Sequence, residues 1–202
     1  MERLTSSLPL AISEMGRRKF SALAGQYFDD EARSEDWPTD VVEDFVLYLE
    51  RTGAAPHAVV VALFELAKRN CADIGPQPLS SSDLQKMPVN RLLTMQVCRH
   101  PAAQAVEVAG QVPTTLLELY PNLKGGDGIL LAKRVGGDLV LPLTIDELAM
   151  FRLLARPRGL VMILGAADAP NDAAAIFHRL VKLGVIIKAK RNQEAVETTG
   201  NA

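Results

Sequence analysis

The sequence predicts an α+β protein, and three observations support this class. Apolar residues recur at helical spacing through most of the first 73 residues. Two apolar runs then flank Gly136-Gly137, the pattern of a β-hairpin. Helix-like segments and a short apolar strand follow the hairpin. We therefore expect an N-terminal α-helical bundle with a linking region (residues 1–124). A C-terminal winged-helix-like module with a small antiparallel sheet follows it (residues 125–202).

The N-terminal half is expected to hold three helices. One amphipathic stretch runs from Leu8 to Tyr27. Thr39 or Asp40 then provides an N-cap, with Glu43 placed as in a capping box, and the next helix buries the face of Val42, Phe45, Val46 and Leu49. A third helix, residues 57–73, is apolar nearly all round, which predicts a central position in the bundle.

The linking region is expected to be mixed. Ser80–Asp83 resembles a cap for a short helix, and Pro113 begins another that runs to Tyr120. Between them, extended segments are expected on either side of Arg99-His100-Pro101.

The C-terminal part begins at a flexible joint, residues 125–128. The hairpin strands, residues 129–134 and 138–143, come next. Thr144 and Glu147 form a capping box for a helix to Leu154, and Leu160–Leu164 forms a short helix or turn. Asn171 caps a third helix that ends at Gly184, and residues 185–190 form a last strand. The polar tail from Asn192 is expected to be disordered.

Composition limits the function classes. The net charge is −2, which argues against a chain wrapped along nucleic acid. No signal peptide and no apolar run of membrane-spanning length are visible, so we expect a cytoplasmic protein with no membrane partner. Two cysteines cannot form a disulfide framework.

We expect no catalytic residue and no metal ligand in this chain. The three histidines, His57, His100 and His178, are too far apart in sequence for a local ligand motif. Cys98 precedes Arg99-His100, but adjacent residues rarely align as nucleophile and base, so a structural cysteine is favoured. The glycine-rich runs at 124–128 and 135–138 lack the residues of a phosphate-binding loop.

The hairpin is the most informative feature. A small sheet with an open edge can accept an extended peptide as an additional strand. The sequence leaves open whether the edge at 129–134 or the edge at 138–143 is free, and whether the chain covers both. The candidate peptide-binding residues are Ile129, Leu131, Lys133, Arg134, Leu139 and Leu141.

Four blocks carry a resemblance to a known family. They are RRKFSALAGQYFDDEARSEDWPTDVVEDFVLYLE (17–50), LFELAKRNCADI (63–74), VNRLLTMQVCRHPAAQAVEVAGQVPTTLLELY (89–120) and GILLAKRVGGDLVLPLTIDELAMFRLLARP (128–157). Their order resembles that of a bacterial family described as DNA-binding, whose members are partners of TIM-barrel multinuclear iron oxidases. Leu66 stands where the family has a tryptophan, and the family's usual long N-terminal segment does not precede the first block.

Among that family, the chain is most similar to the short members, the small subunits of methanobactin-forming pairs. The resemblance implies a non-catalytic accessory subunit in a heterodimer, with the iron ions in the oxidase partner and no cofactor in this chain. The pair would convert cysteines of a ribosomally made precursor peptide into oxazolone and thioamide groups, and this chain would dock the leader. Arg91, Arg99, His100 and Pro101 are then expected near the partner interface. The product and precursor stay open.

A DNA-binding winged-helix regulator is the alternative. It would use the basic residues that follow one another near the C-terminus, which are Arg179, Lys182, Lys188, Lys190 and Arg191. Helix C-terminal charges and gatekeepers on an edge strand would explain the same residues without a ligand.

Overall fold

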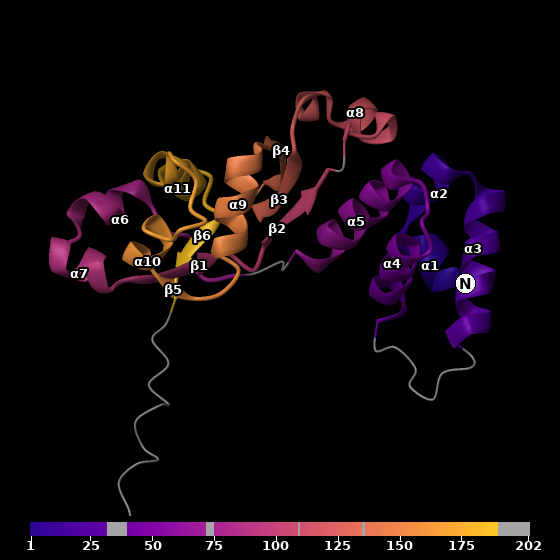
Figure 1. The fold of residues 1–202 in the computed structure, drawn as a ribbon, viewed down its shortest axis with the longest axis horizontal. Coiled ribbons are helices and arrows are strands. Elements are labelled where there is room, and N and C mark those ends of the chain that lie inside the picture. Colours follow the sequence, from indigo (N-terminus) through magenta and orange to yellow (C-terminus); the bar gives the residue numbers. More distant parts are fainter. Residues whose placement is uncertain (32–39, 72–74, 109, 135, 190–202) are drawn as a thin grey trace, which may run out of the picture. The chain divides into compact units, whose positions relative to one another are not determined.

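The computed structural model describes residues 1–31, 40–71, 75–108, 110–134 and 136–189. These residues form eleven α-helices, one 3-10 helix and two three-stranded antiparallel sheets, which confirms the α+β class (Figure 1). None of the helices they form has the length and apolar character needed to cross a bilayer.

The chain divides into two compact units. Unit 1 comprises Met1–Asp73 and Pro101–Leu148, and unit 2 comprises Ile74–His100 and Ala149–Ala202. Both units are therefore discontinuous in sequence. The predicted boundary at residues 124–125 falls inside unit 1, before the central strand of its sheet.

Unit 1 packs a helical bundle on one sheet. Its elements are α1 (Glu2–Ser7), α2 (Pro9–Met15), α3 (Arg17–Glu31), α4 (Val41–Arg51), α5 (Pro56–Asn70), β2 (Ala103–Glu107), α8 (Thr114–Leu119), η1 (Pro121–Leu123), β3 (Gly128–Arg134) and β4 (Gly137–Leu143). The first turns of α9 (Ile145–Leu153) also belong to it.

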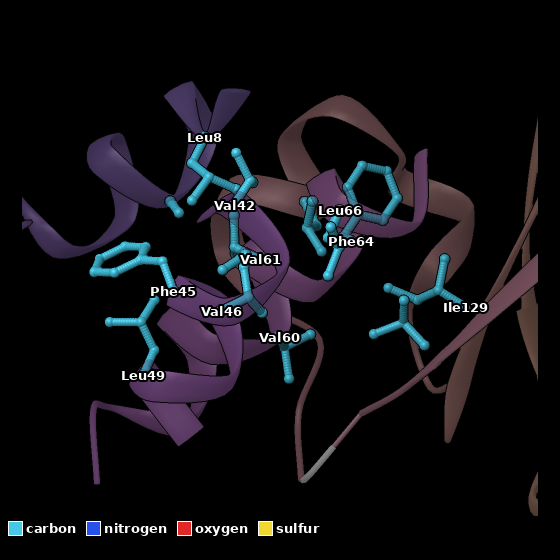
Figure 2. Packing of buried hydrophobic residues seen from close by; sticks show 14 of the residues in the cluster. Leu8, Val42, Phe45, Val46, Leu49, Val60, Val61, Phe64, Leu66 and Ile129 are labelled. Carbon is cyan, nitrogen blue, oxygen red and sulfur yellow. The ribbon is translucent and has the colours of Figure 1, made fainter. Parts of the chain in front are cut away.

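The core of unit 1 joins the bundle to one face of the sheet. The buried faces of α4 and α5 meet Leu8 from the start of α2, and Ile129 of β3 closes the cluster (Figure 2). Phe45 lies between Phe20 and Tyr27, with ring centroids 5.4 Å apart in each pair and edge-to-face geometry. The predicted apolar face of α4 and the burial of α5 are confirmed.

The long N-terminal helix is the first correction. The expected single stretch from Leu8 to Tyr27 is broken into α2 and α3 at Gly16, whose φ is +83°. A positive φ of this size costs conformational free energy in residues other than glycine. The break between the two helices therefore falls at a residue that can adopt this angle. The apolar spacing continues across the break because both helices pack on the same core.

Unit 2 holds the second sheet and shorter helices. Its elements are α6 (Ser81–Lys86), α7 (Val89–Thr94), β1 (Gln96–Arg99), the rest of α9, β5 (Arg158–Gly159), α10 (Leu160–Leu164), α11 (Ala173–Lys182) and β6 (Ile186–Lys188). The sheet order is β5-β1-β6, and both strand pairs are antiparallel.

The hairpin and the closing strand do not share a sheet, contrary to the predicted module. The hairpin strands β3 and β4 pair with β2 in unit 1, whereas β6 pairs with β1 in unit 2. Both β1 and β2 come from the linking region, on either side of Arg99-His100-Pro101. The two extended segments predicted there are confirmed, but nothing local in their sequence says which strand each one joins.

The helix caps follow the predictions closely. The Asp40 carboxylate accepts hydrogen bonds from the backbone N–H groups of Val42 and Glu43. Thr144 and Glu147 exchange the two bonds of a capping box, as do Ser80 and Asp83. The start of α11 is corrected by one residue, because Asp172 rather than Asn171 is its N-cap. Thr39 lies outside the described residues.

Candidate functional site

The predicted peptide-binding residues lie on two faces of the unit 1 sheet. Ile129 and Leu131 are buried against the helical bundle. Leu139 and Leu141 are half-buried and pair with Ala132 and Leu130, which face the other way. Lys133 is half-buried and Arg134 exposed, at the end of β3. The six residues therefore do not form one docking face.

Strand β3 is the central strand of its sheet, which removes one of the two predicted edges. Gly128, the first residue of β3, pairs with Glu107 of β2 on one side and with Leu143 of β4 on the other. Because both sides of the β3 backbone are paired, residues 129–134 have no free edge for a peptide. The continuous apolar run GILLA, which is buried throughout, is the sequence signal of such a central strand.

The outer edge of β4 is obstructed by the chain itself. Val140 directs its carbonyl away from β3, where the Asn122 Nδ2 donates to it at 3.0 Å. Pro142 has no N–H to offer at the next outward position. Lys68 forms an ion pair with Asp138 at 3.3 Å, at the other end of the same edge. A peptide strand would find few groups to pair with here.

The outer edge of β2, which the hairpin pattern did not predict, is half-exposed at Ala105 and exposed at Glu107. Lys133 N donates to Ala102 O, and Val108 N donates to Asp127 O, so even-numbered residues of β2 face β3. The N–H and C=O groups of Ala103 and Ala105 consequently point away from β3. Ala103 is only 1% exposed, so the part of this edge that a peptide could reach begins at Ala105. No hydrogen bond formed among the described residues reaches the outward groups of Ala105. Glu107 continues this edge.

The predicted partner-interface residues have different environments. Arg91 is exposed on α7. Arg99 is half-buried on β1, with its guanidinium carbon 5.6 Å from the centroid of the Phe151 ring, a cation–π contact. His100 is only 7% exposed, and Pro101 falls in the segment assigned to unit 1.

His100 links the segment before α6 to the end of β1 by a side-chain hydrogen bond. Its Nε2 lies 2.7 Å from the carbonyl oxygen of Pro76, and its backbone N–H donates to Val185 O. A Cβ at Gly75 would lie 2.2 Å from the imidazole Cε1, so glycine is needed for this close approach. The geometry gives His100 a structural position inside unit 2.

We expect His100→Ala to lower the free energy of unfolding of unit 2 by about 1–3 kcal/mol, because a buried hydrogen bond and packed volume are lost. Arg91→Ala, at an exposed site, is the matched control and should change it by less than about 0.5 kcal/mol. Chemical denaturation followed by circular dichroism measures both. Equal stabilities of the two variants would contradict this position for His100.

The two cysteines are placed as structural residues. Burial raises the pKa of the Cys71 thiol and of the Cys98 thiol, which favours the protonated form. Cys71 Sγ lies 3.9 Å from the Leu131 carbonyl oxygen. Among the described residues, no group of three or more His, Cys, Asp or Glu side chains could hold a metal ion.

A surface cavity of about 380 Å³ opens beside the turn that leads into β3. Its polar lining comes from Gln111, Lys124 and Asp127, and three glycines contribute backbone. The Asp127 carboxylate already accepts a bond from Ile145 N at 3.0 Å. The cavity contains none of the predicted site residues.

The two units differ strongly in charge. The sequence contains this difference, but the net charge of −2 for the whole chain does not show it. The described part of unit 2 has nine Lys and Arg against three Asp. Residues 84–100 and 149–167 hold six of these cations and no acidic residue. These two stretches supply α7, β1, β5 and α10. Helices α7 and α10 also expose four large apolar side chains, which are Val89, Leu93, Val161 and Met162.

A comparison with protein-family models and a comparison with curated proteins both find no match for this chain.

Proposed function

We propose that this chain is the accessory subunit of an iron-dependent peptide-modifying oxidase in the cytoplasm. It resembles the small partner subunits of methanobactin-forming pairs. In this proposal the TIM-barrel oxidase subunit carries the iron and oxidises cysteines of a precursor peptide to oxazolone and thioamide groups. The present chain holds the leader of that peptide.

The observation that carries the peptide-docking part is the outer edge of β2 at Ala105, which is half-exposed and does not face β3. A leader segment can pair with the outward N–H and C=O groups of Ala105 and extend the sheet to four strands along the later part of β2. The main chain then supplies affinity, and alternate side chains supply register.

Two of the predicted peptide-binding residues, Lys133 and Arg134, lie on β3, one strand further in than this edge. Lys133 is bonded to Ala102 through its backbone N–H at 3.0 Å, so the C-terminal end of β3 lies beside the start of β2. A leader strand on the outer edge of β2 would lie two strand spacings, roughly 10 Å, from the β3 backbone, so an ion pair across β2 needs extended side chains on both strands. Such an exposed ion pair is expected to add only about 0–1 kcal/mol, so it would select register more than affinity.

The test compares two edges by removing one outward N–H from each. Ala105→Pro acts on β2 and Asp138→Pro acts on β4, and neither residue donates to β3. We expect Ala105→Pro to weaken binding of the fluorescently labelled precursor peptide by about tenfold or more, and Asp138→Pro to leave it nearly unchanged. Circular dichroism confirms that both variants fold. Unchanged affinity in both variants would contradict docking at β2, and loss only in Asp138→Pro would assign the peptide to β4.

A DNA-binding regulator is the second candidate, favoured by unit 2. The last part of unit 2 resembles a winged helix in the order of its elements along the chain, which is α9, β5, α10, α11 and β6. In the sheet, β1 lies between β5 and β6 and takes the place of a wing strand. His178, Arg179 and Lys182 form the exposed side of α11, and Lys188 follows on β6. Lys190 and Arg191 lie outside the described residues. Duplex binding that falls steeply with salt would support this candidate.

A further inference from the structure

A cavity of about 380 Å³ lies at the surface of unit 1, where two connections of its sheet meet. Residues 110–112, which follow β2, line it together with Leu117 of α8. Residues 124–127, which lead into β3, complete the lining. The volume falls within the range of small-molecule binding pockets, which is roughly 300–1,000 Å³.

The walls of this cavity are attached to the rest of unit 1. The turn before β3 is closed by a hydrogen bond from Gly126 N to Leu123 O at 3.2 Å. A Cβ at Gly126 would lie 2.8 Å from the Cβ of Pro142, so the turn packs closely on β4. Helix α8 is held to α2 by a hydrogen bond that the Thr115 hydroxyl donates to the Glu14 carboxylate. The cavity is therefore largely formed without a ligand, as is usual for binding pockets.

Two side chains of opposite charge line the cavity without forming an ion pair. Lys124 and Asp127 are both exposed, and neither forms an ion pair with another of the described residues. Asp127 Oδ2 accepts a hydrogen bond from Ile145 N at 3.0 Å, which fixes the carboxylate. Its Oδ1 accepts no bond from the part of the chain that the structure describes. The cavity thus presents a cation and a preorganised anion, each free to bind a ligand group of the opposite charge.

The rest of the side-chain lining defines the class of ligand. Val112, which is 7% exposed, and the half-buried Leu117 are aliphatic. A ligand with an ammonium group, a carboxylate and an aliphatic portion is complementary to the cation, the anion and the apolar lining together. A ligand of one charge fits less well, because an anion would be repelled by Asp127 and a cation by Lys124. A metal ion would find one carboxylate here, and the described residues contain no metal-binding group of three or more His, Cys, Asp or Glu.

We propose that this cavity binds a zwitterionic α-amino acid with an aliphatic side chain. The Lys124 ammonium contacts the carboxylate of the ligand, and the Asp127 carboxylate contacts its ammonium group. Val112 and Leu117 contact its side chain. The inference goes beyond the proposed function, because it depends on neither the oxidase nor the precursor peptide.

The experiment titrates the isotope-labelled full chain with L-leucine and follows the backbone amide signals of Gly125 and Gly126 by NMR. Both glycines line the cavity. Two analogues keep the side chain of leucine and remove one charge each. Leucinamide lacks the carboxylate, and isocaproate lacks the ammonium group.

Four variants change the charges of the protein. Lys124→Met and Asp127→Asn remove the two charges of the cavity, and the asparagine oxygen can still accept the bond from Ile145 N. Lys19→Met and Asp29→Asn, at exposed positions of α3, are the matched controls. Thermal unfolding verifies that each variant folds.

We expect L-leucine to shift both glycine signals saturably, and each analogue to bind about fivefold more weakly, since one ion pair at an exposed site is lost. Lys124→Met should weaken leucine binding by about the same factor without weakening leucinamide, and Asp127→Asn should do so without weakening isocaproate. Both controls should bind leucine like the wild type. A lack of saturable shifts with leucine would overturn the proposal. An affinity for either analogue that equals or exceeds the affinity for leucine would overturn it as well, because the cavity would then not recognise both charges.

Discussion

Replacing Phe45 by alanine is expected to lower the free energy of unfolding of unit 1 by about 3–5 kcal/mol. Phe45 is fully buried in α4, and its ring contacts the rings of Phe20, Tyr27 and Tyr48. Its removal deletes apolar area and leaves a cavity that the surrounding helices can fill only in part. A loss of this size is a large share of the stability of an ordinary domain.

Intrinsic fluorescence in urea measures this loss selectively. All three tyrosines and the single tryptophan belong to the segments assigned to unit 1. Leu47→Ala is the matched control, because Leu47 lies on the same helix and is 45% exposed. It should change the free energy of unfolding by less than about 1 kcal/mol. A loss under 1 kcal/mol in Phe45→Ala would contradict the placement of this ring at the centre of the bundle.

Glu65→Ala should also be strongly destabilising, by about 2–4 kcal/mol, because it leaves two N–H groups without their acceptor. Glu65 is 8% exposed on α5. Its two carboxylate oxygens accept from Leu10 N at 2.7 Å and from Ala11 N at 2.9 Å, the first turn of α2. Glu65→Gln should lose less, since the amide oxygen can still accept one of the two bonds.

Glu65 also predicts a pH dependence. Burial raises the pKa of this carboxyl above its ordinary value of 4.5, although the two N–H donors act in the opposite direction. With a raised pKa the folded state binds the proton more tightly than the unfolded chain. The contribution of Glu65 to stability therefore falls as the pH rises from 4.5 through the folded-state pKa. Urea titrations across this range should show that Glu65→Gln removes this slope, and an identical slope in both proteins would contradict it.

Local chemistry made several elements predictable from sequence. Asp40, the Thr144–Glu147 pair and Gly184 mark helix ends because caps are short-range hydrogen bonds and backbone conformations. The hairpin around Gly136-Gly137 was predictable for the same reason. The partner strands were not, because β2 joins β3 and β1 joins β6 through contacts between residues far apart in the chain.

The candidate site was harder to predict than the fold. The hairpin pattern predicts that Ile129 and Leu131 contact a peptide, but the helical bundle covers both side chains. His100 was expected near a partner interface, but its ring is buried in unit 2 beside Gly75. Exposure of Leu93 and Met162 depends on how α7 and α10 pack, which a pattern of apolar residues does not reveal. Two signals were available in the sequence: the charge of each segment, and the continuous apolar run of residues 128–132 that marks a central strand.

The most direct test of the central claim is the mass of the complex formed when this chain is co-expressed with the oxidase subunit. Size exclusion with light scattering gives the stoichiometry, and metal analysis of the same fractions locates the iron. We expect a one-to-one complex that contains iron, and we expect no iron to be bound by the present chain when it is purified alone. A chain that elutes by itself in the presence of the oxidase would contradict it.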